Sequence, residues 1–396
     1  MTQLPRKALF SLPEGVIYLD GNSLGPLPKA VPDALARVAA QEWAGELIKG
    51  WNTCGWMEQP ARVGDRVGQL IGAEPGSVVM GDTLSIKVFQ ALTAALDLRP
   101  KRRVILSDSG NFPTDLYMAE GLIALKDKGY ELRLVAPDAV GESIDEDVAA
   151  VMLTHIDYRT GRMHDMDAIT AKAHESGAVM IWDLAHSAGA VPVDLAACGC
   201  EFAIGCTYKY LNGGPGAPAF IYARPDLIDG IAPALSGWLG HDAPFAFETS
   251  YRPAASVERL RVGTPPVLQM AALDCALDVW DGVSMSEVRK ASIELSEAFI
   301  EEVERHCPDL VMASPRNPHE RGSQVSFAFE NGYAVIKALI ARGVIGDFRA
   351  PNLMRFGFTP LYQDLDDIRD AAAILGDVMK NRLWDDPQYK IVSRVT

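Results

Sequence analysis

The sequence predicts an α/β protein built around a doubly wound, mostly parallel sheet. Between residues 77 and 223, short runs of β-branched and apolar residues alternate with segments of helical composition. The runs are apolar along their whole length, as is typical of strands covered by helices on both faces. In such sheets ligands bind beyond the carboxyl ends of the strands, so functional residues are expected there. The seven predicted strands are 77–80, 103–106, 131–136, 148–154, 178–183, 202–207 and 219–223.

The alternation of predicted strands and helices changes near residue 277, which predicts a second, smaller domain. A long amphipathic helix at about 285–307 is followed by a proline-rich turn and a mixture of short strands and helices. We expect a large domain over 61–276 and a small α+β domain over 277–396. Residues 1–60 are expected to pack with the small domain or against a second subunit.

An amphipathic helix is predicted within this N-terminal segment, over residues 28–49. Apolar residues recur there at the 3.6-residue period of a helix. The apolar side comprises Val31, Leu35, Val38, Ala39 and Trp43.

Composition and charge exclude several classes of protein. The chain has 396 residues, of which 48% are hydrophobic and 22% charged, enough to build a sizeable core. The 37 basic and 52 acidic residues give a formal charge of -15, which repels phosphate backbones, so nucleic acid is not expected as a partner. No apolar run approaches the roughly 20 residues of a membrane helix, and no membrane partner is expected.

The N-terminus and the cysteines favour a cytoplasmic protein. Pro5 and Pro13 interrupt the first apolar stretch, whereas the apolar region of a signal peptide is continuous. The six cysteines include no Cys-x-x-Cys pair, and the seven histidines lack metal-binding spacing. A reduced, cytoplasmic protein without a metal is the simplest interpretation.

Two ionisable residues follow predicted strands. Lys209 precedes a glycine-rich loop, and a lysine at a strand's carboxyl end can form a Schiff base once its pKa is lowered. Asp183 ends the strand one βα unit earlier, and an aspartate facing a pyridinium nitrogen keeps that nitrogen protonated. Taken singly, Lys209 could be a solvated loop lysine and Asp183 a helix-capping aspartate. The presence of both residues at neighbouring strand ends favours the functional interpretation. His186, three residues after Asp183, fits a ligand contact and a buried structural histidine equally well.

Further candidates stand at helix starts and inside a strand. The hydroxyl of Ser85 and the free N–H groups of its helix could hold a phosphate, although an ordinary helix cap fits equally well. Phe112 could stack on an aromatic ring, with Asp115 accepting hydrogen bonds nearby. Arg355 lies within an apolar strand, where it needs a carboxylate partner from a substrate or from the protein itself.

Together these residues resemble the site of pyridoxal phosphate enzymes of fold type I, the aspartate aminotransferase fold. Specific motifs further resemble the kynureninase family, in the same order from residue 18 to about residue 360. They are YLDGNSLGPLP (18–28), NFPTD (111–115), DLAHSAGAV (183–191), YKYLNGGPGAPAF (208–220) and Trp-Leu-Gly-His (238–241).

The resemblance implies roles for individual residues. Lys209 would carry the cofactor, Asp183 would face the pyridine nitrogen, and Arg355 would bind the substrate α-carboxylate. The remaining positions implied around the cofactor are Leu84, Ser85, Phe112, Asp115, Thr154, His186, Tyr208, Trp238 and Thr264, and those near the substrate ring are Asn22, Ser23 and Trp51. The family supplies Trp238 and Thr264 from the neighbouring subunit, which implies a homodimer.

The implied reaction is hydrolysis of L-kynurenine to anthranilate and L-alanine, as in tryptophan catabolism. The sequence does not decide between L-kynurenine and its 3-hydroxy form as the preferred substrate. Lys209 and Tyr208 are the expected proton carriers.

Four other classes of protein are compatible with parts of this pattern. An aminotransferase shares the lysine, aspartate and arginine and differs only in the specific motifs. A cysteine desulfurase needs a mobile late cysteine, whereas Cys307 ends a predicted helix. A non-catalytic protein of this fold would be expected to lose Lys209 or Asp183, and a nucleotide-binding protein would need a Gly-x-Gly-x-x-Gly or phosphate-loop motif.

Overall fold

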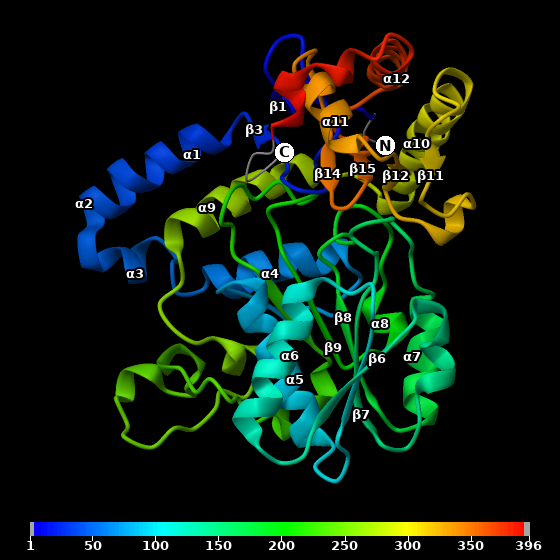
Figure 1. Cartoon of the computed structure of the whole chain (residues 1–396). Coiled ribbons are helices and arrows are strands. Elements are labelled where there is room, and N and C mark those ends of the chain that lie inside the picture. Colours follow the sequence, from blue (N-terminus) through cyan, green and yellow to red (C-terminus); the bar gives the residue numbers. More distant parts are fainter. Residues whose placement is uncertain (1–3, 392–396) are drawn as a thin grey trace.

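Two sheets of unequal size lie one above the other in the computed structural model, which describes residues 4–391 (Figure 1). The larger sheet has seven strands in the order β4-β10-β9-β8-β7-β5-β6. Strands β9, β8, β7, β5 and β6 pair in parallel, and β10 runs antiparallel to both of its neighbours. The predicted mostly parallel seven-stranded sheet is confirmed. Its strands are β4 (Val78–Met80), β5 (Val104–Asp108), β6 (Glu131–Val135), β7 (Val148–Thr154), β8 (Val179–Asp183), β9 (Phe202–Gly205) and β10 (Phe220–Ala223).

Successive residues of these strands enter two different hydrophobic cores. Val78 and Met80 belong to one core, whereas Val79 between them belongs to the other. Because strand side chains alternate between faces, both faces must be covered by helices. Helices on the first face are α4 (Gln59–Leu70), α7 (Met166–Glu175), α8 (Leu195–Cys198) and α9 (Val267–Ala276), and those on the second are α5 (Leu84–Leu98) and α6 (Pro113–Lys126).

The smaller sheet is antiparallel and covered by helices on one face. Its strands are β11 (Val311–Met312), β12 (Gln324–Ala328), β15 (Leu353–Gly357) and β14 (Asp347–Arg349), in that order. Its core receives side chains from α10 (Met285–His306), α11 (Gly332–Ile340) and α12 (Leu365–Lys380). Cross-strand register places Ser326, Asp347 and Arg355 opposite one another, so they share the other face. That face is polar and contacts the large domain: the Ser326 hydroxyl donates to the carbonyl of Arg159 over 2.6 Å.

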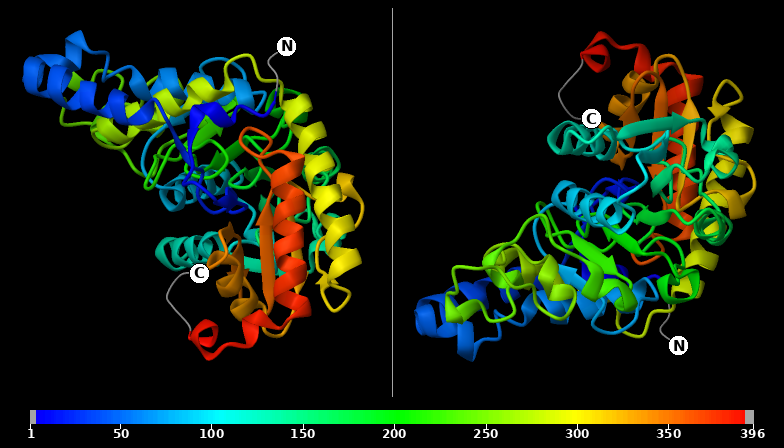
Figure 2. Two further views of the ribbon diagram at one scale, coloured as in Figure 1. Left: turned by 90° about the horizontal axis from the view of Figure 1, so that it is seen from above. Right: turned by 90° about the horizontal axis from the view of Figure 1, so that it is seen from below.

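The N-terminal segment first contacts both sheets and then projects away from them as a helical arm. Strand β1 (Phe10–Ser11) pairs with β3 (Leu27–Pro28), and β2 (Ile17–Tyr18) pairs with β13 (Val344–Ile345). Phe10 enters the core of the large sheet and Leu19 that of the small one. The arm extends away from both sheets in Figures 1 and 2. It consists of α1 (Val31–Arg37), a π-helical stretch (Val38–Trp43), α2 (Ala44–Glu46) and α3 (Gly50–Thr53).

On the predicted apolar stripe of this arm, Val31 and Val38 are buried, whereas Trp43 is 59% exposed. Val38–Trp43 is π-helical, and a π-helix has more residues in each turn than an α-helix. Trp43 therefore stays on the same side as Val38, and the two side chains line one apolar pocket.

The predicted domain boundaries stay a prediction. Leu277, Trp280 and Val288 pack into the core of the large sheet, although they follow residue 276. Within residues 4–391, no helix is both long and apolar enough to cross a membrane.

Candidate active site

The candidate site lies at the carboxyl edge of the large sheet, beneath the polar face of the small sheet. Thr154 ends β7 and Asp183 ends β8, and the strand register sets these two residues side by side. Strand β9 leads into the loop that carries Lys209. Because parallel strands end at the same edge, residues far apart in sequence converge there.

The Lys209 amine contacts a neutral histidine. Its Nζ lies 2.9 Å from Nε2 of His186, whose side chain is buried. Burial and the charge of Lys209 lower the pKa of His186 well below its usual value. The imidazole is therefore neutral at neutral pH, and Nε2 accepts a hydrogen bond from the lysine. Nδ1 is buried and has no hydrogen-bond partner among the described residues.

Asp183 is a buried carboxylate with few donors. The N–H of Ala185 donates to Oδ1 over 2.8 Å, and Thr154 Oγ1 lies 3.5 Å from Oδ2. Burial raises the pKa of Asp183 to about 6, so the group is ionised at neutral pH. Burial and the charge of Asp183 raise the pKa of Asp115 well above its usual value, so Asp115 stays protonated. The pair thus carries one negative charge, which a cationic group facing Asp183 would balance.

The loop after β5 supplies a predicted residue and a missed one. Thr154 Oγ1 donates to Asn111 Oδ1 over 2.5 Å, and Asn111 Nδ2 donates to Ser107 Oγ over 2.9 Å. Asn111 was missed, although it opens the NFPTD motif. Phe112 remains 41% exposed while its ring stands edge-on to Tyr158 at 5.1 Å. The network holds Thr154 in place and leaves Phe112 available to a planar ligand.

The start of α5 and Tyr208 lie at the other side of the site. Thr83 is extended and Leu84 begins the helix, so the N–H groups of the first turn, including that of Ser85, lack intrahelical acceptors. Such a turn attracts phosphate. The Lys209 Nζ lies 5.8 Å from the centre of the Tyr208 ring. Cys206 and burial raise the pKa of Tyr208 above its usual value, so the phenol keeps its proton.

Arg355 brings the small sheet into the site. It is 1% exposed, donates to the carbonyl of Tyr158, and donates through Nη2 to Ser23 Oγ over 2.9 Å. It also forms an ion pair with Asp347. The sequence left open a substrate or a protein carboxylate as its partner, and the structure provides the protein carboxylate. Asn22, which precedes Ser23 in the sequence, is fully buried and donates to the side chain of Gln324 over 3.0 Å.

Three predicted residues lie apart from this group. Trp51 on α3 packs edge-on against Trp56 at 5.5 Å, and Trp238 packs against Phe245 at 5.7 Å. Trp238 is 43% exposed and Thr264 is exposed. None of the three makes a contact with Lys209 or Asp183 among the interactions of residues 4–391. Trp51 belongs to the arm, and Trp238 begins a short 3-10 helix (Trp238–Gly240).

The side chains at the sheet edge fit pyridoxal phosphate. Lys209 offers an amine, Asp183 a buried anion, and the first turn of α5 free N–H groups. His186 Nδ1 is buried without a hydrogen-bond partner in the described part of the chain. Bound cofactor would supply a polar atom for it. No group of three or more His, Cys, Asp or Glu residues within 4–391 is arranged to hold a metal ion.

Comparison with solved structures identifies the fold. An apo cysteine desulfurase from Thermococcus onnurineus superposes with a TM-score of 0.81 at 18% identity, covering 96% of this chain and 99% of that one. A mutant of C-DES with glycine covalently linked to its pyridoxal phosphate cofactor gives 0.81 at 17% identity, covering 94% and 99%. The chain therefore has the architecture of pyridoxal-phosphate-dependent enzymes of fold type I.

Comparison with known sequences identifies the family. The kynureninase C-terminal domain model matches residues 288–375, and the DegT/DnrJ/EryC1/StrS aminotransferase model matches residues 90–203. Kynureninase of Pseudomonas fluorescens is 50% identical over 99% of this chain and 96% of its own length, and that of Burkholderia pseudomallei (strain K96243) is 48% identical over the same shares. The chain belongs to the kynureninase family.

A close backbone approach yields a prediction about the lysine loop. The N–H of Gly25 donates to the carbonyl of Tyr208 over 2.8 Å, and a Cβ on Gly25 would stand 2.3 Å from the carbonyl oxygen of Lys209. Gly25→Ala must therefore displace the loop. Overpacking costs about 1–3 kcal/mol, so we expect cofactor binding to weaken roughly tenfold or more, measured by absorbance titration with pyridoxal phosphate. Gly121→Ala, in open space on α6, serves as the control. Unchanged cofactor affinity in Gly25→Ala would contradict this account of the loop.

Proposed function

We propose that the chain hydrolyses L-kynurenine to anthranilate and L-alanine with pyridoxal phosphate as its cofactor. Its relatives at about 50% identity over nearly the whole chain are kynureninases. The observation that carries the proposal is the convergence of Lys209, His186 and Asp183 at the sheet edge. Arg355 enters from the small sheet. The 3-hydroxy form of the substrate is compared in the test below.

Asp183 and Lys209 have separate roles in the proposed reaction. When bound, pyridoxal phosphate supplies an electron sink beside the substrate amino group. Asp183 would hold a proton on the pyridine nitrogen, because a buried carboxylate favours a positive charge at the atom that faces it. Lys209 would carry the cofactor through Nζ. Once the substrate amine takes that place, Nζ is free to accept the proton from the substrate α-carbon.

Proton delivery in the later steps falls to Tyr208. Its phenol keeps its proton at neutral pH because Cys206 and burial raise its pKa. It also lies beside the Lys209 amine. Water attacks the γ-carbonyl of the substrate, and the bond between the β-carbon and the carbonyl carbon breaks. Anthranilate leaves, and the β-carbon must then gain a proton to give L-alanine, for which Tyr208 is the proposed relay.

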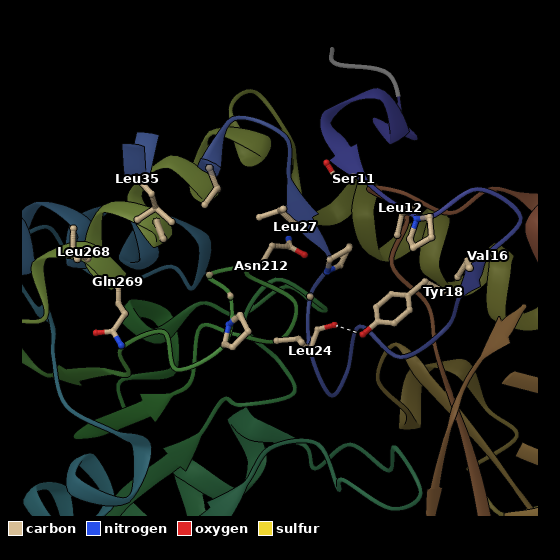
Figure 3. A pocket seen from close by; sticks show the side chains of 18 of the residues that line it. Ser11, Leu12, Val16, Tyr18, Leu24, Leu27, Leu35, Asn212, Leu268 and Gln269 are labelled. Atoms are coloured by element: carbon tan, nitrogen blue, oxygen red, sulfur yellow. Dashed lines mark hydrogen bonds between the residues drawn. The ribbon is translucent and has the colours of Figure 1, made fainter. Parts of the chain in front are cut away.

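A homodimer would complete the site, and the exposed apolar surface supports it. Trp43, Leu47 and Ile48 on the arm are 59%, 63% and 78% exposed. An apolar cavity of about 770 Å³ lies between the N-terminal segment, the loop after Lys209 and α9, and Figure 3 shows the side chains that line it. A second subunit covering these surfaces could bring its Trp238 and Thr264 to the neighbour's cofactor. We place the enzyme in the cytoplasm, because all six cysteines are free thiols.

The reaction is tested with purified protein, pyridoxal phosphate and L-kynurenine, by following anthranilate fluorescence. We expect anthranilate from the wild type and none from Lys209→Ala, because the amine that carries the cofactor and moves the proton is lost. Lys101→Ala, on the exposed surface, should keep full activity. A wild type that shows the visible band of bound cofactor without producing anthranilate would contradict the proposed substrate. 3-Hydroxykynurenine and amino-group acceptors would then be compared.

The relay role of Tyr208 predicts a separation of two quantities. Tyr208→Phe removes the proton but keeps the ring, so turnover should fall by about 100-fold or more while cofactor affinity changes far less. Steady-state kinetics and absorbance titration measure the two effects. Tyr117→Phe, 65% exposed on α6, controls for loss of a phenol elsewhere. Equal losses in turnover and in cofactor affinity would count against the relay.

The shared site predicts complementation between two inactive variants. Lys209→Ala and Trp238→Ala should each have little activity alone. After mixing and subunit exchange, a mixed dimer contains one site with both residues intact, so about a quarter of wild-type activity should return at equal concentrations. Size-exclusion chromatography checks that dimers are present. No gain over the separate variants, or full activity of Trp238→Ala, would refute the exchange of Trp238 between subunits.

A further inference from the structure

Two arginines share one carboxylate on the polar face of the small sheet. Asp347 on β14 lies opposite Arg355 on β15, and Arg349, two residues further along β14, points to the same face. Arg349 Nη2 lies 2.9 Å from Asp347 Oδ2, and Arg355 Nη2 contacts that same oxygen. Asp347 is 3% exposed. The sequence analysis singled out Arg355 alone.

The two guanidinium groups differ in accessibility. Arg355 is 1% exposed, and both of its Nη atoms already donate, to the Tyr158 carbonyl and to Ser23 and Asp347. The side chain of Arg349 is 38% exposed. Its described hydrogen bonds run to Asp347 and, at 3.4 Å, to the carbonyl of Phe348. An anion that enters from solvent therefore meets Arg349 before Arg355.

Arg349 also lies within electrostatic range of the reacting groups. The pKa of His186 is lowered first by burial and then by the charges of Lys209, Arg355 and Arg349. Both guanidinium groups thus lie within electrostatic range of the histidine that contacts the Lys209 amine.

The charges of this cluster leave room for one further anion. Among the described residues, two guanidinium groups face Asp347 and Asp20. Burial and Asp347 raise the pKa of Asp20 to about 7, so Asp20 is only partly ionised at neutral pH. The two guanidinium groups therefore carry more positive charge than Asp347 and the partly ionised Asp20 balance, and a carboxylate at the exposed side of Arg349 would offset the excess.

We propose that Arg349 is a second substrate-binding residue, which forms with Arg355 a two-guanidinium receptor for the substrate α-carboxylate. Asp347 is the shared counter-ion that holds the two groups together. The substrate carboxylate binds at the open side of Arg349, while Asp347 keeps Arg355 in position. The identity of the substrate rests on the proposed function, whereas the receptor requires only an α-amino acid.

The test measures binding and turnover in the holoenzyme of Arg349→Gln. Charge-assisted hydrogen bonds are strong, so we expect the KM for L-kynurenine to rise roughly 10- to 150-fold, with a smaller change in kcat. The dissociation constant of L-alanine, read from the visible absorbance of the bound cofactor, should rise by a similar factor. Arg349→Lys keeps the charge and should recover part of both losses.

Arg342→Gln is the matched control. Arg342 has a similar exposure of 41% and forms an ion pair with Asp377 over 2.8 Å, on α12 away from the polar face. Both constants should stay at their wild-type values in this variant. An unchanged KM and L-alanine affinity in Arg349→Gln would overturn the proposal, as would a loss of kcat alone. Because L-alanine binding needs no turnover, the receptor is tested even if L-kynurenine proves not to be the substrate.

Discussion

The 2.9 Å contact between the Lys209 amine and His186 places an amine beside the buried carboxylate of Asp183, under the small sheet. Charged groups are stable in such a place only when opposite charges and hydrogen bonds compensate for lost water. The parallel strands meet this demand because their carboxyl ends bring Thr154, Asp183 and the Lys209 loop to one edge. The polar face of the small sheet closes the other side.

The surroundings of these groups set their protonation states. The low pKa of His186 makes it an acceptor for the lysine, and the raised pKa of Asp115 leaves Asp183 as the ionised member of its pair. Gly25 lies so close to the lysine loop that any side chain at this position would collide with the backbone of Lys209. The ion pairs of Asp347 hold Arg355 and Arg349 opposite this group.

The sequence predicted those features of the fold and the site that depend on apolar runs and on the residues that follow them. All seven strands of the large sheet lie within two residues of their predicted ends, because each is a continuous apolar run. Lys209, Asp183 and Thr154 could be placed together because they follow strands of one parallel sheet. Arg349 was missed because β14 has three residues, too few for alternation to be recognised. The contacts of Trp238 and Thr264 with the cofactor, and of Trp51 with the substrate ring, stay a prediction.

Attachment of the cofactor to Lys209 is the central claim, and borohydride reduction followed by peptide mass spectrometry tests it most directly. Reduction makes the bond between lysine and cofactor permanent, so the modified peptide identifies the residue. We predict a single modified site at Lys209. Lys87 on α5 is the alternative buried lysine, fully buried and 3.0 Å from the Gln90 side-chain oxygen. Modification at Lys87, or no modified peptide from protein saturated with pyridoxal phosphate, would contradict the account.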